Sequence, residues 1–123
     1  MPKILLIEDD ANVSDLYDEV LTEGGYEVEI VDDGEEAKTR AIAGGWDLML
    51  LDIMLPKLDG MELLRAIKND RNVITKPIII LSALEKKEII EECLKLGAKQ
   101  YLVKSNIYPN DLLNAVSRYF PKD

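Results

Sequence analysis

The stretch Leu48-Met49-Leu50-Leu51-Asp52-Ile53-Met54-Leu55-Pro56 decides the fold of this chain. It is an apolar run of strand length, closed by Pro56 and by the turn signal Asp59-Gly60. In a chain of 123 residues, such a run is typical of a strand buried on both faces at the centre of a parallel sheet. Asp52 is then expected at the carboxyl edge of the sheet. A buried charge is tolerated only beside a partner or a metal, so other charged groups are expected near Asp52.

Strand patterns and helical patterns alternate along the rest of the chain. Besides the central stretch, strands are expected over residues 3–7, 26–31, 78–82 and 100–103. Helices are expected over residues 11–23, 35–43, 60–69, 86–96 and 110–120, with Asn110 or Asp111 as a candidate cap of the last one. This alternation predicts a single α/β domain over residues 1–123, a (βα)5 doubly wound parallel sheet with right-handed crossovers.

The composition narrows the function. With 24 acidic and 15 basic residues the formal charge is −9, which disfavours direct contact with nucleic acid or an anionic membrane and favours proteins or a cation as partners. The chain has no histidine, so histidine triads and imidazole zinc sites are excluded. The single Cys93 is interpreted as a small buried hydrophobe. The start has no signal-peptide pattern and no apolar stretch approaches membrane-spanning length, so a cytoplasmic location is expected.

Polar residues follow the expected strands where the strands end. They are Glu8, Asp9 and Asp10 after the first strand, Asp52 after the third, Ser82 after the fourth and Lys104 after the fifth. Functional groups of open α/β sheets gather at this edge. Convergent carboxylates predict a site for a hard divalent cation such as Mg²⁺, and Lys104 could attract an anion brought to Asp52. Taken singly, Asp9 or Asp10 could instead be a helix N-cap, and Ser82 an ordinary strand-end hydroxyl.

These segments resemble the receiver domain of two-component response regulators along essentially the whole chain. The matching segments are Ile4-Leu5-Leu6-Ile7-Glu8-Asp9-Asp10, the central stretch with Asp47 before it and Asp59-Gly60-Met61-Glu62-Leu63 after it, Ile78-Ile79-Ile80-Leu81-Ser82-Ala83, Gly97-Ala98, and Tyr101-Leu102-Val103-Lys104. The resemblance implies a flavodoxin-like sheet with strand order 2-1-3-4-5.

The resemblance also implies a role for each matching residue. Asp52 matches the acceptor that takes a phosphoryl group from a phosphohistidine, and Glu8, Asp9, Asp52 and the backbone carbonyl of Met54 match the Mg²⁺ ligands. Lys104 matches the lysine that pairs with the phosphoryl group, Ser82 the hydroxyl that bonds it, and Tyr101 the aromatic that turns inward in step. The implied partners are a sensor histidine kinase or phosphotransfer protein and a downstream protein target, which would bind around the fourth helix, fifth strand and fifth helix. The resemblance implies a signalling switch rather than an enzyme, and no output domain is expected within residues 1–123.

The chain departs from the family pattern at four positions. Ser105 stands where proline usually follows the lysine in a cis bond. Because a cis bond without proline costs about 2.5–4 kcal/mol, the Lys104-Ser105 peptide is predicted to be trans. Lys99-Gln100 replaces two acids that many transcriptional receivers use in a dimer, so that dimer is not predicted. The bulky Leu84 is hypothesised to hinder water and to lengthen the life of an acyl phosphate.

Three other functions compete with a phosphorylated receiver. An aspartyl-phosphate hydrolase needs a second acid two residues after the nucleophile, where this chain has Met54. A flavodoxin-like cofactor protein needs a phosphate-binding loop after the first strand, where Glu8-Asp9-Asp10 would repel phosphate. The remaining alternative is a pseudo-receiver, a protein-interaction module that is not phosphorylated. The intact acidic set argues against it, while the departure at Ser105 keeps it open as an alternative.

Overall fold

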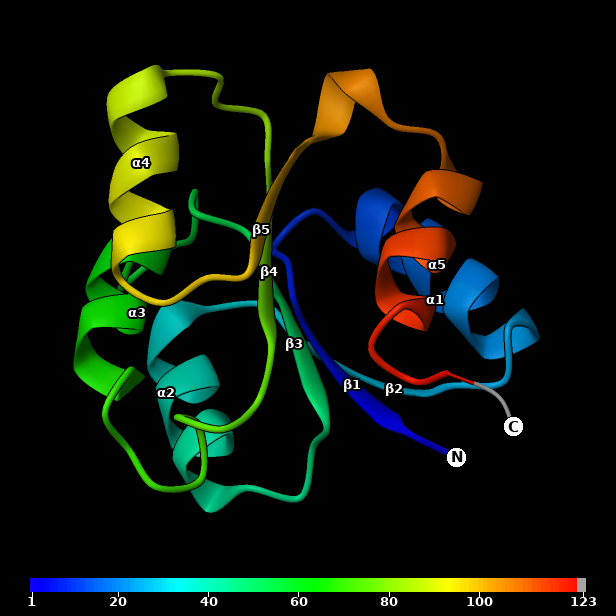
Figure 1. Cartoon of the computed structure of the whole chain (residues 1–123), viewed down its shortest axis with the longest axis horizontal. Helices are drawn as coiled ribbons and strands as arrows, with labels where there is room; N and C mark the ends of the chain where they lie inside the picture. The colour runs from blue at the N-terminus through cyan, green and yellow to red at the C-terminus, as the bar shows by residue number, and fades with distance from the viewer. Residues whose placement is uncertain (122–123) are drawn as a thin grey trace.

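A computed structural model describes residues 1–121 of the chain and contains five strands and five α-helices (Figure 1). In chain order they are β1 (Lys3–Ile7), α1 (Ala11–Glu23), β2 (Glu27–Val31), α2 (Gly34–Ala43), β3 (Leu48–Leu51), α3 (Gly60–Ile67), β4 (Ile78–Ser82), α4 (Lys87–Lys95), β5 (Gln100–Val103) and α5 (Pro109–Ser117), with a 3₁₀ turn, η1, at Lys104–Asn106 before α5. The strands form one parallel sheet in the order β2-β1-β3-β4-β5. The predicted flavodoxin-like architecture is confirmed.

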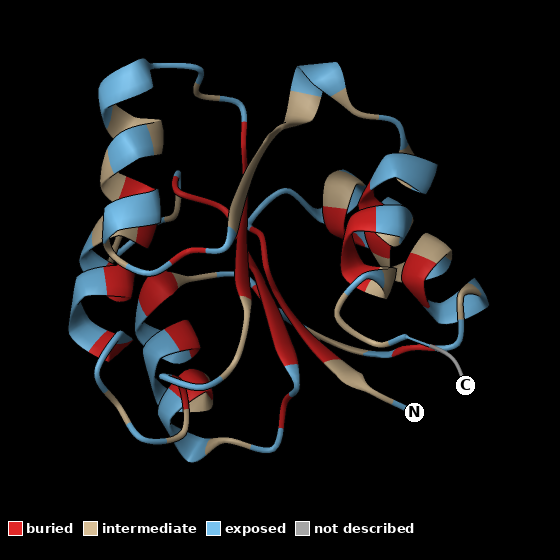
Figure 2. Cartoon of the chain, viewed as in Figure 1, coloured by how far each residue is buried: buried red, intermediate tan, exposed pale blue. Residues whose placement is uncertain are grey.

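Helices cover both faces of this sheet. In Figure 1, α2, α3 and α4 lie on one side, and α1 and α5 lie on the other. The side chains of β3 alternate between the two cores that result: Met49 and Leu51 pack with the α2–α4 side, and Leu48 and Leu50 with the α1–α5 side. Figure 2 shows the central strands as buried, while β2 at the edge is only partly so. Burial on both faces explains why β3 carries no polar residue.

The register of the sheet brings the carboxyl ends of the central strands together. Ile7 pairs with Leu51, and Leu51 pairs with Ile80. Ser82 pairs with Val103 at the end of β5. The residues that follow β1, β3 and β5 therefore meet at one edge of the sheet.

Strand β3 ends at Leu51, as expected from the placement of Asp52 directly after it, and residues 53–59 form a loop in which Lys57 has a φ of 68°. The predicted start of the last helix needs correction. Helix α5 begins at Pro109, so neither Asn110 nor Asp111 is its N-cap. Proline suits the first helical position because its fixed φ is already helical and its missing N–H would have no partner there. Asp111 instead accepts a hydrogen bond from the Tyr108 N–H at 2.6 Å, at the third position of the helix.

Within residues 1–121, no helix is both long and apolar enough to cross a membrane. Cys93, predicted to be a buried hydrophobe, is fully buried. Its burial raises the pKa of the thiol to about 11, which keeps it protonated.

Candidate functional site

Asp52 lies directly after β3 and is 5% exposed. Its N–H donates to the Ile7 carbonyl at 3.0 Å, which continues the β1–β3 ladder by one residue. Its Oδ1 accepts a hydrogen bond from the Met54 N–H at 3.0 Å. Gly60 allows the chain to fold back closely here, because a Cβ at that position would lie 2.5 Å from the Asp52 carbonyl oxygen. The carboxylate is thus held by the backbone that follows it.

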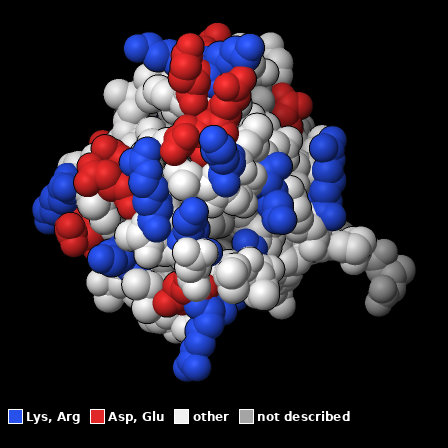
Figure 3. Space-filling model, turned by 60° about the vertical axis from the view of Figure 1, so that its left-hand side comes forward, with Lys and Arg blue, Asp and Glu red and all other residues white. Residues whose placement is uncertain are grey.

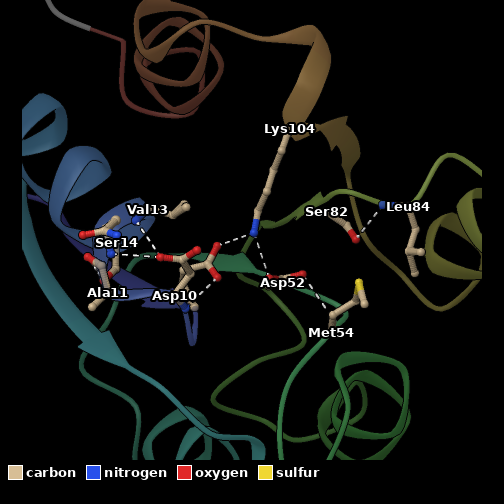
Figure 4. A network of polar contacts seen from close by, with 11 residues as sticks. Asp10, Ala11, Val13, Ser14, Asp52, Met54, Ser82, Leu84 and Lys104 are labelled. Carbon is tan, nitrogen blue, oxygen red and sulfur yellow. Dashed lines mark hydrogen bonds and ion pairs between the residues drawn. The ribbon is translucent and has the colours of Figure 1, made fainter.

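Lys104 reaches this carboxylate from the end of β5. Its Nζ lies 2.9 Å from Asp52 Oδ2 and 2.5 Å from Glu8 Oε1 (Figure 4). Burial alone would lower the pKa of the ammonium, but the contacts with Glu8 and Asp52 outweigh burial and raise it. The lysine is therefore a fixed positive charge between two carboxylates.

Glu8, Asp9 and Asp52 form a cluster in which one carboxylate oxygen of each lies within 4.8 Å of the others. Glu8 is 2% exposed, and its Oε1, although close to Lys104, has no aligned hydrogen-bond donor among the described residues. Burial raises the pKa of Glu8, and the nearby charge of Asp52 adds to this effect. Three carboxylates this close together, two of which share the single charge of Lys104, fit a hard cation such as Mg²⁺.

Asp10 has a different task from the two acids before it. Its Oδ1 accepts hydrogen bonds from the Asn12 and Val13 N–H groups at 2.9 and 3.3 Å, so it is the N-cap of α1. Asp9 is exposed and is not this cap. The sequence indicates Asp9 or Asp10 as a candidate helix cap. Asp10 is the cap, and Asp9 belongs to the carboxylate cluster with Glu8 and Asp52.

A cavity of about 300 Å³ opens beside Asp52 and is lined by these groups. The acids Glu8, Asp9 and Asp10 border it together with Lys104, Met54 and Ala83. Space next to the carboxylate makes it accessible to a small reactant, although its own surface is almost covered.

Ser82 does not border this cavity; it is fully buried at the end of β4. Its Oγ accepts a hydrogen bond from the Leu84 N–H at 3.2 Å, and the Leu84 carbonyl accepts one from the Tyr101 hydroxyl at 2.7 Å. The backbone of Leu84 therefore links the hydroxyl of β4 to the aromatic residue of β5. This link is absent from the sequence prediction because any residue at position 84 offers the same backbone groups.

The loop after Lys104 has no cis peptide bond, so the trans prediction for Lys104-Ser105 is confirmed. The Ser105 hydroxyl donates to Glu85 Oε1 at 3.3 Å. Serine thus connects the loop after β5 to the loop after β4, a contact that proline at this position has no hydroxyl to make.

Comparisons with known proteins agree on one family. The family model described as "Response regulator receiver domain" matches residues 4–117. The transcriptional regulatory protein CrdR of Helicobacter pylori is 37% identical over 98% of this chain and 56% of its own length. The chemotaxis protein CheY of Treponema pallidum is 41% identical over 83% of this chain and 72% of its own.

Solved structures show the same likeness. Chemotaxis protein CheY4 of Vibrio cholerae superposes with a TM-score of 0.88 at 29% identity, covering 98% of this chain and 99% of that one. The longer transcriptional regulators are matched only in part: the chain spans 56% of CrdR and 44% of the regulator CusR of Escherichia coli.

Proposed function

The chain belongs to the family of response regulator receiver domains, and we propose that it accepts a phosphoryl group on Asp52 as a switch in two-component signalling. The observation that carries this proposal is the setting of Asp52: a buried carboxylate held by the Met54 N–H and Lys104, at the wall of a cavity that Glu8 and Asp9 also line. The donor would be a histidine kinase or phosphotransfer protein, since the chain has no histidine of its own.

In this reaction the protein contributes little covalent chemistry beyond the Asp52 nucleophile. An oxygen of Asp52 attacks the phosphorus of a phosphohistidine, the P–N bond breaks, and its electron pair leaves with the imidazole nitrogen, which takes a proton. The product is an acyl phosphate on the carboxylate. Such transfers depend on positioning and on neutralising the charge of the transferred group.

Glu8, Asp9 and Asp52, with the Met54 backbone carbonyl, would hold Mg²⁺. A bound Mg²⁺ supplies positive charge against the phosphoryl oxygens. Lys104 offers the second positive charge, because its ammonium already lies 2.9 Å from the acceptor carboxylate. Placing Lys104 on the phosphoryl group would separate it from Glu8, to which it is also paired.

The switch would pass through Ser82, Leu84 and Tyr101. A phosphoryl dianion on Asp52 attracts the Ser82 hydroxyl, which now bonds the Leu84 N–H. Moving that hydroxyl would disturb the loop that also holds the Tyr101 hydroxyl. We infer that the surface around α4, β5 and α5 changes in consequence and controls the binding of a downstream protein. Direct nucleic-acid binding is not part of this proposal, because the net charge is −9.

The experiment is intact-mass measurement after incubation with Mg²⁺ and acetyl phosphate. The parent chain is expected to gain one phosphoryl group, and neither Asp52→Asn nor a sample treated with EDTA is expected to gain it. Asp32→Asn is the matched control, since Asp32 belongs to a second, separate acidic cluster with Asp33 and Glu36. This variant is expected to be phosphorylated like the parent. A folded parent that gains no phosphoryl group from acetyl phosphate or from a phosphorylated histidine kinase would favour the pseudo-receiver instead.

A further inference from the structure

A second cavity, of about 280 Å³, lies at the opposite edge of the sheet from Asp52. Its walls are the C-terminal ends of α3 and α4 and the start of β4. Four lysines border it and no acidic residue does. The four are Lys68, Lys76, Lys95 and Lys99.

These four lysines border one cavity without an acidic side chain among them. The chain as a whole carries a net charge of −9, yet none of the four forms an ion pair with any residue of the described part, 1–121. On the face seen in Figure 3, acidic and basic side chains lie together at the top, most charged side chains in the middle are basic, and further acidic side chains lie at the left and at the bottom. Like charges around one cavity repel one another unless an anion lies among them.

The position of most of these lysines has an ordinary explanation when each is taken alone, but these explanations do not account for all four lying around one cavity. Lys68 and Lys95 stand at the C-terminal ends of α3 and α4, where cations are favoured by the helix dipole. The Lys76 ammonium lies 4.6 Å from the centre of the Trp46 ring, a cation–π contact that fixes its position. Neither kind of contact is present for Lys99, and neither explains why all four border the same cavity.

The C-terminal ends of α3 and α4 carry partial negative charge, which opposes the binding of an anion. Whether an anion is attracted therefore depends on the sum of these partial charges and the lysine charges. Two helix C-termini contribute together about −1 elementary charge, against four ammonium groups, which leaves a local charge of about +3. The cavity therefore remains electropositive.

The floor of the cavity is apolar. Val73 and Ile78 are buried there, and Ile74 beside them is 61% exposed. Binding sites for small molecules combine such an apolar lining with a few convergent polar groups, and their volumes begin at about 300 Å³. We propose that this cavity binds a small ligand with two or more linked phosphate groups, such as a nucleoside diphosphate, with its phosphates among the lysines and its organic part against Ile74.

Calorimetric titration with two probes, sodium pyrophosphate and adenosine diphosphate, tests the proposal. EDTA is present throughout, so that Mg²⁺-dependent binding near Asp52 does not contribute. Both probes are expected to bind one to one, with an affinity that falls as salt rises. Adenosine diphosphate is expected to bind more tightly than pyrophosphate, and Ile74→Ser is expected to remove the difference in affinity between the two probes.

A pair of double variants separates the cavity from general electrostatics. Lys95→Gln with Lys99→Gln is expected to weaken binding of both probes at least about tenfold, a loss of about 1.4 kcal/mol. Lys86→Gln with Lys87→Gln changes the net charge equally at the other end of α4 and is expected to stay within about twofold of the parent. Asp52→Asn is expected to bind the probes like the parent, so failure of the phosphorylation proposal and failure of this one are distinguishable.

Three results would overturn the proposal. The first is that neither probe binds to the folded parent chain. The second is that the two double variants lose affinity equally, which would assign binding to net charge alone. The third is loss of binding in Asp52→Asn, which would place the probes at the carboxyl edge of the sheet.

Discussion

The charged residues at the two edges of the sheet differ in burial and in pairing. At the carboxyl edge, Glu8 and Asp52 are 2% and 5% exposed and share Lys104 between them. At the amino edge, Lys95 and Lys99 are exposed and have no carboxylate partner within the described residues. The carboxyl edge holds buried charges that neutralise one another, and the cavity at the amino edge is bordered by charges of one sign.

This difference shows how burial determines what a cluster of charges does. A buried charge is tolerated only when a partner or a metal compensates it, so removing one member of the cluster at the carboxyl edge should destabilise the fold. Exposed lysines cost little stability, so the amino edge can change without affecting the fold. Substitutions of the same kind at the two edges should therefore have very different effects.

The largest expected effect is that of Lys104→Met compared with Lys95→Met. Removing Lys104 leaves Glu8 and Asp52 without their shared cation, and the free energy of unfolding measured in urea without Mg²⁺ should fall by about 2 kcal/mol. That is less than for a fully buried pair, because the Lys104 side chain is 19% exposed. The loss should shrink as pH is lowered, since burial raises the pKa of Glu8 and protonation removes its charge.

Lys95→Met should change the free energy of unfolding by less than about 0.5 kcal/mol, as expected for an exposed side chain. Equal losses of unfolding free energy in Lys104→Met and Lys95→Met would show that the two edges do not differ in this way.

The next effect is stabilisation by Mg²⁺. At a Mg²⁺ concentration ten times its dissociation constant, the free energy of unfolding of the parent should rise by about 1.4 kcal/mol. Asp9→Asn should lose this response, while Asp10→Asn should keep it, because Asp10 caps α1 and asparagine caps a helix equally well. Denaturation in urea with and without Mg²⁺ measures both. A response that survives in Asp9→Asn would remove Asp9 from the metal site.

A smaller effect distinguishes the neighbouring acids by stability alone. Asp10→Ala should lower the free energy of unfolding without Mg²⁺ by about 1 kcal/mol, because the Asn12 and Val13 N–H groups lose their acceptor. Asp9→Ala, at an exposed position that caps nothing, should not destabilise the metal-free protein. Thermal and urea unfolding of the two variants provide the comparison, and the reverse order would contradict the assignment of the cap.

The smallest expected effect concerns an ion pair that belongs to neither edge. Glu29 in β2 accepts a hydrogen bond from Arg40 Nη2 at 2.8 Å and lies 3.1 Å from Lys3 Nζ. The Arg40 contact is the main cause that lowers the pKa of Glu29 to about 2, against partial burial, which raises it. A lowered folded-state pKa gives stability that is present above the unfolded value of 4.5 and is lost as pH falls toward 2.

Glu29→Gln should therefore cost up to about 1 kcal/mol at pH 7, a figure that is discounted because the pair is partly solvated. This loss of stability should disappear near pH 2. Urea unfolding of the parent and of Glu29→Gln at a series of pH values from 7 to 2 measures it. A cost that is independent of pH would show that packing of the Glu29 side chain, rather than its charge, is responsible.

The order of elements and the composition of the carboxyl edge were predictable from the sequence. Strict alternation of patterns predicted the sheet, and the isolated carboxylate at position 52 indicated the candidate site, because an acid in so apolar a run needs a partner. Lys104 was predicted near Asp52, and the two groups lie 2.9 Å apart.

What the sequence could not predict depends on backbone geometry. The link from Ser82 to Tyr101 passes through backbone groups of Leu84, which carry no residue signature. The start of α5 was misplaced because Pro109 outweighed the capping preference of Asn110 and Asp111. The lysine cavity was not predicted, since its four members are separated in sequence and each is ordinary for its local position.

Mapping the phosphorylated residue tests the central claim most directly. Borohydride reduces an acyl phosphate to the alcohol, so treating the chain after incubation with acetyl phosphate and Mg²⁺ converts the acceptor aspartate to homoserine, which peptide mass spectrometry locates. We expect homoserine at position 52 alone, and none without Mg²⁺. Homoserine at position 9 or 10, or no reduced residue in a sample whose mass shows a phosphoryl group, would contradict the assignment of Asp52 as the acceptor.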